Sequence, residues 1–133
     1  MIYQELSNKV IKAFYNVYNL LGYGFLEKVY ENALIFELKS LNLNAEQQKK
    51  IQVHYKDIIA GEYFADILVE NSIIIELKAA ENICEEHIAQ LTNYLKATDI
   101  ELGLLFNFGK KPEFKRIIFT NDKKKIRYDS SNS

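Results

Sequence analysis

The sequence predicts an α/β fold in which a mixed β-sheet is flanked by helices. Three observations favour this class. Two amphipathic helical patterns open the chain, three strand-like segments follow, and a third helical pattern precedes two more strands. The predicted order is therefore α-α-β-β-β-α-β-β. With 133 residues, 48% of them hydrophobic, the chain can bury a core and fits a single domain over residues 1–133.

The first two elements are helices joined by a short glycine-containing link. From Gln4 to Leu21, apolar residues recur every three or four positions with charged and amide residues between them. Gly22 and Gly24 supply permissive backbone that ends this helix. A second helix is predicted over residues 25–41, packed on the first as a hairpin. Its expected buried stripe consists of Leu26, Val29, Tyr30, Ala33, Leu34 and Leu38.

The pattern then changes to the alternation of β-strands. Polar and apolar residues alternate from Lys50 to Lys56, which predicts a strand with one solvent-facing side. Asp57–Glu62 is expected to form the turn into a second strand, Phe64–Val69. Glu70–Ser72 then leads into a third strand, Ile73–Leu77. Because the second and third strands are almost continuously apolar, helices must cover both faces of the sheet.

The last third of the chain predicts one helix and two strands. The helix is expected over residues 82–97, with Asn82 as its N-cap. Leu102–Phe108 is then a buried strand, and Phe114–Thr120 is a strand at the sheet edge. From Asn121 the sequence is polar, and this tail is expected to be flexible.

Composition indicates a cytoplasmic protein without a membrane partner. A lone cysteine, Cys84, excludes an internal disulfide framework and fits a reducing compartment. No apolar run approaches the roughly 20 residues of a membrane span, and the first residues lack the apolar core of a signal peptide. His54 and His87 do not have metal-ligand spacing, so no zinc site is expected.

Basic charge is concentrated near the C-terminus. Residues 1–108 carry 9 Lys and Arg against 15 Asp and Glu, whereas residues 109–128 carry 8 against 2. Such a cluster could follow a nucleic-acid backbone, or it could be a solvated segment that balances the charge of the rest. The candidate contacts are Lys110, Lys111, Lys115 and Arg116.

The stretch from Tyr63 to Ala79 is the most informative about function. Its two apolar strands contain three ionisable side chains, Asp66, Glu76 and Lys78. Burying a carboxylate or an ammonium group costs several kcal/mol unless the charge is paired or binds a metal. Three such groups in one apolar hairpin therefore suggest a functional site.

The register of this hairpin decides whether the three side chains meet. Glu76 and Lys78 are two positions apart and share a face of the sheet. A turn centred on Asn71 places Asp66 opposite Glu76 on that face, whereas a two-residue turn places it opposite Leu77 on the other face. We therefore predict an odd-length or bulged turn.

Two adjacent carboxylates suit a divalent cation, because the ion relieves their repulsion. Asp66 and Glu76 offer hard oxygen ligands to Mg²⁺ or Mn²⁺, and the Leu77 backbone carbonyl could add another. Such an ion acidifies a coordinated water and polarises a phosphoryl oxygen, while Lys78 could orient the water or offset transition-state charge. The pattern favours a metal-dependent phosphodiesterase site. The simpler alternative is that Lys78 pairs with Glu76 or Asp66.

Two motifs flank this hairpin. Gly24, Glu27 and Tyr30 have the spacing G-x-x-E-x-x-Y, which presents an acid and a hydroxyl on one face of a helix. Gln90 and Tyr94 lie four positions apart on the third helix and could hold a phosphate or a water. In isolation, the first motif is more simply a first-turn glutamate that favours the helix dipole, with Tyr30 in the core. The second is more simply an exposed amide beside a half-buried tyrosine.

Together the segments GYGFLEKVYENAL, YFADILVENSIIIELKA, HIAQLTNYLKAT and LGLLFNFG resemble the GxxExxY proteins, a branch of the PD-(D/E)XK nuclease superfamily. The resemblance covers nearly the whole chain and implies a restriction-endonuclease-like sandwich. It implies that Asp66 and Glu76 are metal ligands and that Lys78 is the catalytic lysine. Glu27 would match the acidic residue that the first motif brings towards the metal.

The resemblance implies a Mg²⁺- or Mn²⁺-dependent nuclease whose partner is nucleic acid, DNA more than RNA. Tyr30, Gln90 and Tyr94 are the expected substrate-positioning residues, since Gln90 and Tyr94 look like an element that related exonuclease-like branches place beside their active site. Two alternatives stay open. The chain could be a catalytically silent nuclease-fold module that binds nucleic acid or a protein, or a structural homo-oligomerisation domain.

Overall fold

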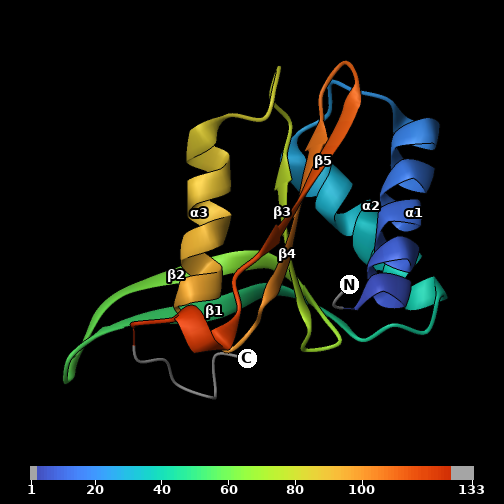
Figure 1. Cartoon of the computed structure of the whole chain (residues 1–133). Coiled ribbons are helices and arrows are strands. Elements are labelled where there is room, and N and C mark those ends of the chain that lie inside the picture. Colours follow the sequence, from blue (N-terminus) through green and yellow to red (C-terminus); the bar gives the residue numbers. More distant parts are fainter. Residues whose placement is uncertain (1–2, 127–133) are drawn as a thin grey trace.

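The computed structural model describes residues 3–126 and confirms the predicted α/β fold and element order (Figure 1). None of the helices in this part of the chain is long and apolar enough to cross a membrane. The elements are α1 (Gln4–Leu21), α2 (Glu27–Ser40), β1 (Ala45–Tyr55), β2 (Ile58–Val69), β3 (Ile73–Lys78), α3 (Glu85–Lys96), β4 (Leu102–Phe108), β5 (Pro112–Ile118) and a short 3-10 helix, η1 (Asn121–Lys123).

The five strands form one mixed sheet in the order β1-β2-β3-β4-β5. Strands β3 and β4 are parallel, and the other three neighbouring pairs are antiparallel. Parallel neighbours need a crossover connection, which α3 supplies. Helices α1 and α2 lie on one side of the sheet and α3 on the other (Figure 1). The expectation of a sheet covered on both faces and of β5 as an edge strand is therefore confirmed.

Alternating residues of β3 belong to the two layers of the core. Ile73, Ile75 and Leu77 pack in the cluster beneath α1 and α2, whereas Ile74 packs in the cluster beneath α3. Successive side chains of a strand point to opposite faces. Glu76 and Lys78, which have the same parity as Ile74, are therefore directed to the α3 face.

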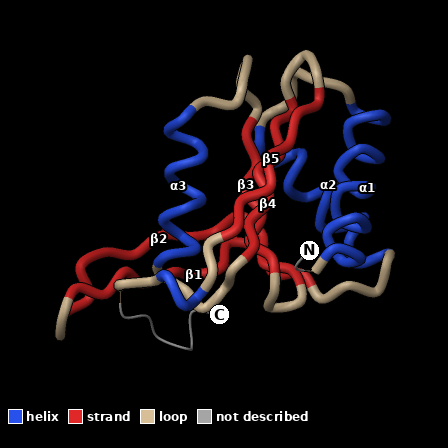
Figure 2. The backbone as a smooth tube through the Cα atoms, viewed as in Figure 1, coloured by secondary structure: helices blue, strands red, loops and turns tan. Residues whose placement is uncertain are grey.

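Strands β2 and β3 separate after a short pairing. Their ladder runs from Val69 opposite Ile73 to Ile67 opposite Ile75 and ends there. Beyond that point β2 stays paired with β1, and the two strands extend below α3 as a ribbon, while β3 continues beside β4 (Figures 1 and 2). We call residues 49–65 the β1–β2 arm. Asp66 and Glu76 stand where the arm leaves the rest of the sheet.

The turn predicted at Asp57–Glu62 is wrong. Strand β2 resumes at Ile58 after a two-residue turn at Lys56 and Asp57. Gly61, which suggested a turn, instead lies beside the irregularity in pairing between Val53 and His54. A glycine inside a strand is a common sign of such a bulge.

The predicted starts of the second and third helices also need correction. Helix α2 begins at Glu27. The predicted burial of Leu26 and Val29 is wrong, since they are 79% and 39% exposed. This first turn lies at the end of β3, beyond the core. Helix α3 begins after Cys84 rather than after Asn82. The His87 ring, in the first turn of α3, accepts a hydrogen bond from the N–H of the N-cap residue Cys84 at 3.2 Å.

The segment after β5 differs from the expected flexible tail. The Asn121 N–H donates to Glu101 Oε2 at 2.7 Å, and Lys124 Nζ donates to the carbonyls of Thr98 and Ile100, both at 2.7 Å. Residues 121–124 are thus held against the loop between α3 and β4. The remainder of the tail, residues 127–133, lies outside the described residues.

Candidate active site

The predicted odd-length turn between β2 and β3 is confirmed. Glu70, Asn71 and Ser72 form it, with positive φ angles of 52° at Glu70 and 49° at Asn71. The register that follows places Asp66 across from Glu76, one position beyond the last paired residues. The two carboxylates therefore approach each other where the backbone ladder has ended.

Side chains replace backbone pairing at this point. The Asp66 N–H donates to Glu76 Oε1 at 3.3 Å, and the Leu77 N–H donates to Asp66 Oδ2 at 2.8 Å. Each carboxylate thus binds the backbone of the opposite strand. Because the N–H and C=O of one strand residue point to the same side, the Leu77 carbonyl also faces this gap. The arrangement fixes both acids and directs three oxygen-bearing groups to one place.

The carboxylate pair is electrostatically strained. Glu76 is 3% exposed, and burial, followed by the neighbouring Asp66 carboxylate, raises the pKa of Glu76 to about 10. A proton or a cation is needed to relieve this repulsion. Two carboxylates and a carbonyl are the hard oxygen donors that Mg²⁺ and Mn²⁺ prefer, so the donor set fits such an ion.

Lys78 lies on the same face of β3, half-buried beside these acids. Its charge lowers the pKa of Glu76, but it is the weakest of the influences on that group. Among the described residues, the ion pairs do not join Lys78 to Asp66 or Glu76. Lys78 is therefore near the carboxylates without being neutralised by a direct contact, which differs from the simple pairing considered above.

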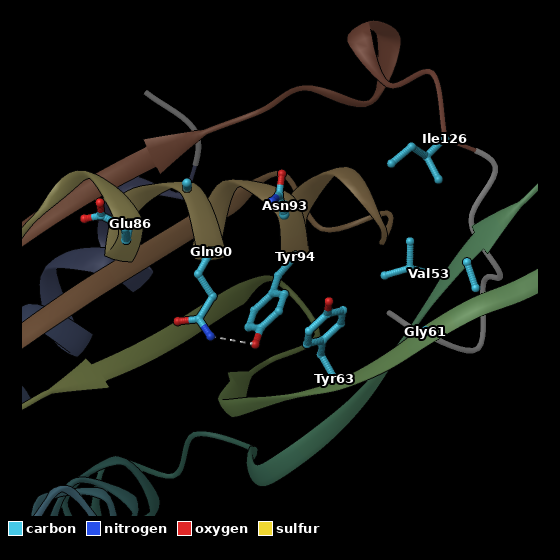
Figure 3. Close-up of a pocket in the computed structure, with 10 residues that line it drawn as sticks. Val53, Gly61, Tyr63, Glu86, Gln90, Asn93, Tyr94 and Ile126 are labelled. Atoms are coloured by element: carbon cyan, nitrogen blue, oxygen red, sulfur yellow. Dashed lines mark hydrogen bonds between the residues drawn. The ribbon is translucent and has the colours of Figure 1, made fainter.

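Helix α3 brings Gln90 and Tyr94 to the same region. Gln90 Nε2 donates to the Tyr94 hydroxyl at 3.1 Å (Figure 3). Burial, followed by the Glu76 carboxylate and, more weakly, that of Asp66, raises the pKa of Tyr94 to about 12. Tyr94 packs in the cluster beneath α3 that also contains Ile74, so Tyr94 and the Gln90 bonded to it lie on the sheet face to which Glu76 is directed.

The G-x-x-E-x-x-Y motif reaches the site only in part. Glu27 Oε2 accepts a hydrogen bond from the Ala79 N–H at 3.3 Å, one residue beyond Lys78. No group of three or more His, Cys, Asp or Glu side chains within residues 3–126 is arranged to hold a metal ion. The structure therefore places Glu27 at the end of β3 without gathering it with Asp66 and Glu76 as a third ligand.

The substrate-positioning role predicted for Tyr30 is wrong. The Tyr30 side chain is fully buried and stacks on Phe108 with a centroid separation of 4.1 Å. Its hydroxyl donates to the Gly22 carbonyl at 2.6 Å and accepts the Phe25 N–H at 3.2 Å. Tyr30 thus closes the link between α1 and α2 and has no polar group left for a substrate.

Two residues that the sequence did not single out connect α2 to the site. Glu31 is 4% exposed and accepts hydrogen bonds from Lys28, Gln47 and Gln48, the last at 2.9 Å. The Gln48 amide also lies 3.5 Å from Asp66 Oδ1, and Gln48 has a left-handed backbone with φ 53°. One signal was available, since Glu31 interrupts the buried stripe of α2.

The proposed nucleic-acid contacts lie on β5 and the turn before it. Lys110, Lys111 and Lys115 are exposed. Arg116 differs, since its side chain is half-buried. Its guanidinium donates a hydrogen bond to Ser7 Oγ at 3.1 Å, which ties β5 to α1. Arg116 therefore has a structural contact that the expectation of a free basic side chain did not include.

Comparison with known proteins agrees with this fold. The crystal structure of SSO0001 superposes with a TM-score of 0.52 at 22% sequence identity, covering 70% of this chain and 50% of that one. The chain thus spans about half the length of that protein, and the likeness concerns the fold alone. No curated protein matches. The sequence model of the PD-(D/E)XK nuclease superfamily matches residues 4–117, and the chain belongs to that superfamily.

Proposed function

We propose that this protein is a Mg²⁺- or Mn²⁺-dependent nuclease that hydrolyses phosphodiester bonds in nucleic acid. The observation that carries the proposal is the paired carboxylates of Asp66 and Glu76 at the separation of β2 and β3, with Lys78 beside them on the same face. Glu76 is buried and Asp66 half-buried, and the ion pairs among the described residues do not neutralise either acid. Such an acid pair is costly in a purely structural protein, whereas a metal-dependent hydrolase needs one.

Each residue has a definable task in this proposal. Asp66, Glu76 and the Leu77 carbonyl would hold the ion, and their hydrogen bonds across the gap keep both acids in place. The ion supplies Lewis-acid chemistry, lowering the pKa of water and polarising a phosphoryl oxygen. Lys78, which has three N–H donors, orients the attacking water or offsets negative charge on the transferred phosphoryl group.

The remaining motif residues support this chemistry from the rim. The Tyr94 hydroxyl accepts a hydrogen bond from Gln90, so its own proton is free to be donated to a phosphate oxygen. Glu27 fixes the end of β3 through Ala79 and acts as an auxiliary acid near Lys78. This use of the first motif, together with its spacing, also supports membership of the narrower GxxExxY branch.

The test is metal-dependent cleavage of single- and double-stranded DNA and RNA. Wild type should cut at least one substrate in Mg²⁺ or Mn²⁺ and none in EDTA. Lys78→Ala should lose activity by about a hundredfold or more, the range expected when a transition-state donor is removed, while still binding Mn²⁺ by calorimetry. Lys12→Ala, an exposed lysine of α1, is the matched control and should retain wild-type activity.

Two results would overturn the proposal. One is a folded wild type that neither binds Mn²⁺ nor cuts any of the four substrates. The other is nucleic-acid binding without cleavage under any metal, which would identify the chain as a silent nuclease-fold module.

A further inference from the structure

A pocket of about 640 Å³ lies between α3 and the β1–β2 arm (Figure 3). Its walls include Val53 and Tyr63 from the arm, Gln90, Asn93 and Tyr94 from α3, and Ile126 after η1. Three separate parts of the chain therefore enclose it. The functions assigned above to these elements do not require such a space.

The floor of the pocket is aromatic. Tyr63 pairs with Ile51 in the sheet, and Ile51 packs beneath α3, so Tyr63 is directed to the same side. The rings of Tyr63 and Tyr94 lie side by side with a centroid distance of 5.7 Å and an interplanar angle of 46° (Figure 3). Tyr94 is buried, whereas Tyr63 is 51% exposed. Tyr63 thus offers a ring surface on which a planar group could stack.

The polar groups of the pocket suit a neutral planar ligand. Gln90 and Asn93 carry amides, which can both donate and accept hydrogen bonds. Among the described residues that line the pocket, Glu86 is the charged one, and it is an acid. A phosphate would meet repulsion there and no cationic partner. A nucleobase, with two flat faces and a mixed donor and acceptor edge, matches the lining.

The pocket shares Gln90 and Tyr94 with the proposed catalytic site. Tyr94 and Gln90 line the pocket, and the Tyr94 hydroxyl is also within electrostatic reach of Glu76 and Asp66. A nucleotide whose base occupies the pocket would therefore have its sugar and phosphate on the side of the carboxylates. The position of Lys78 agrees with this orientation, because its positive charge lies beside the carboxylates, where the phosphate would be, and not in the lining of the pocket.

We propose that this pocket binds one unpaired nucleobase of the substrate strand, stacked on Tyr63 with its edge against the amides of Gln90 and Asn93. The inference rests on the proposed function in that the ligand is nucleic acid. Bases within a duplex are already stacked on both faces, and an enzyme reaches them only in single strands or after extrusion. The substrate is therefore single-stranded or frayed nucleic acid.

The experiment measures binding in EDTA, so that the result does not depend on cleavage. Fluorescence anisotropy compares three labelled probes: a short oligothymidylate, an abasic oligonucleotide of equal length, and a duplex of equal length. Oligothymidylate should bind more tightly than either of the others. Tyr63→Ala should weaken its binding about tenfold, within the range measured for loss of one base–aromatic stack. Tyr63→Ala should leave the binding of the abasic probe unchanged.

Two variants separate stacking from loss of structure. Tyr63→Phe keeps the ring and should bind oligothymidylate within about twofold of wild type, a difference too small for a lost stack. Tyr55→Ala removes another tyrosine of the arm, 61% exposed and outside the pocket, and should also remain within about twofold. Equal binding of oligothymidylate by wild type and Tyr63→Ala would overturn the base site, as would an equal loss for the abasic probe.

Photocrosslinking gives an independent readout. An oligonucleotide containing 5-iodouracil should crosslink to peptides that contain Tyr63 or Tyr94, and crosslinks confined to residues 110–116 would contradict the proposal. The outcomes also separate the two proposals. Metal-dependent cleavage with no effect of Tyr63→Ala on binding rejects only the base site. Base-dependent binding without cleavage in any metal rejects only the nuclease.

Discussion

The two faces of the sheet are both well covered, yet they are built from different chemistry. Beneath α1 and α2, Phe14 stacks on Phe106 at 4.4 Å and meets Phe108 edge-on at 4.9 Å, in a cluster that is almost wholly apolar. Beneath α3, apolar packing gives way to Asp66 and Glu76 where β2 leaves β3. One face stabilises the fold, while the other holds groups that oppose folding until a cation or proton neutralises them.

The largest effect on stability should come from removing an aromatic ring from the core beneath α1 and α2. Phe14→Ala removes a fully buried ring that contacts two others and should lower the free energy of unfolding by about 3–5 kcal/mol. Phe36→Ala, on α2 but 71% exposed, is the matched control and should change it by less than about 0.5 kcal/mol. Urea denaturation followed by circular dichroism measures both. Similar losses in the two variants would show that the stability is not concentrated on this face.

The next effect concerns the α3 face and its support from α2. Gln48→Ala removes the amide that links Glu31 to Asp66 and should reduce Mn²⁺ affinity or cleavage by about 10–100-fold, as for other residues that orient metal ligands. Gln47→Ala also loses a hydrogen bond to Glu31 but none to Asp66, so its activity should stay near wild type. Equal activity in the two variants would contradict the positioning role of Gln48.

Substitutions of Gln48 also test whether its left-handed backbone conformation is strained. A non-glycine residue with a left-handed backbone is destabilised by about 1 kcal/mol or more. Gln48→Gly should therefore be more stable than Gln48→Ala by about 1 kcal/mol in urea denaturation, while both lose the same activity. If the glycine variant were the less stable, the left-handed conformation would carry no strain.

The sequence predicted the elements whose periodicity is local and regular. Gln4–Leu21 and Leu102–Phe108 were placed with the bounds that the structure has, because one apolar stripe or one apolar run defines each. The parity argument about Asn71 also located Asp66 opposite Glu76. Parity works there because a buried hairpin tolerates only registers that keep its apolar side chains inside.

The sequence could not predict features that depend on contacts distant along the chain. Gly61 looks the same in a turn as in a strand irregularity, and only the pairing of β1 with β2 decides between them. Gln48 reaches Asp66 because of a left-handed backbone that glutamine does not favour by itself. Likewise, Tyr30 and Tyr94 each belong to a plausible motif, and only packing shows that Tyr30 is enclosed in the core while Tyr94 bonds to Gln90 and lines the pocket.

A smaller effect should appear in the stability of the metal-free site. The pKa of Glu76 in the folded protein, about 10, lies above its ordinary value of 4.5. The protonated acid therefore stabilises the fold fully below about pH 4.5, and this contribution is lost as pH rises towards about 10. Glu76→Gln keeps the size of the side chain and an acceptor for the Asp66 N–H but cannot ionise.

Thermal denaturation in EDTA should accordingly show wild type losing stability more steeply than Glu76→Gln between these pH values. At neutral pH the variant should be the more stable by on the order of 1 kcal/mol. Adding Mn²⁺ should raise the melting temperature of wild type and leave that of Glu76→Gln unchanged. Parallel pH curves in EDTA would argue against a strained acid pair.

The last comparison removes one buried tyrosine hydroxyl from each face. Tyr30→Phe leaves the Gly22 carbonyl and the Phe25 N–H without their buried partner, so it should lower stability by about 1–3 kcal/mol. Its activity per folded molecule should not change, because Tyr30 does not reach the site. Tyr94→Phe loses only a hydrogen bond from Gln90 and should alter stability by less than about 1 kcal/mol.

The activity of Tyr94→Phe should nevertheless fall several-fold, because its hydroxyl, which Gln90 holds and whose pKa the Glu76 and Asp66 carboxylates raise, is the group that we propose donates to a phosphate oxygen. Single-turnover cleavage rates, set beside urea denaturation of the same two preparations, make the comparison direct. The opposite result, with activity lost in Tyr30→Phe and stability lost in Tyr94→Phe, would contradict the assignment of stability to the α1/α2 face and of activity to the α3 face. The pair is informative because the same single atom is removed from both faces, so any difference reflects its surroundings.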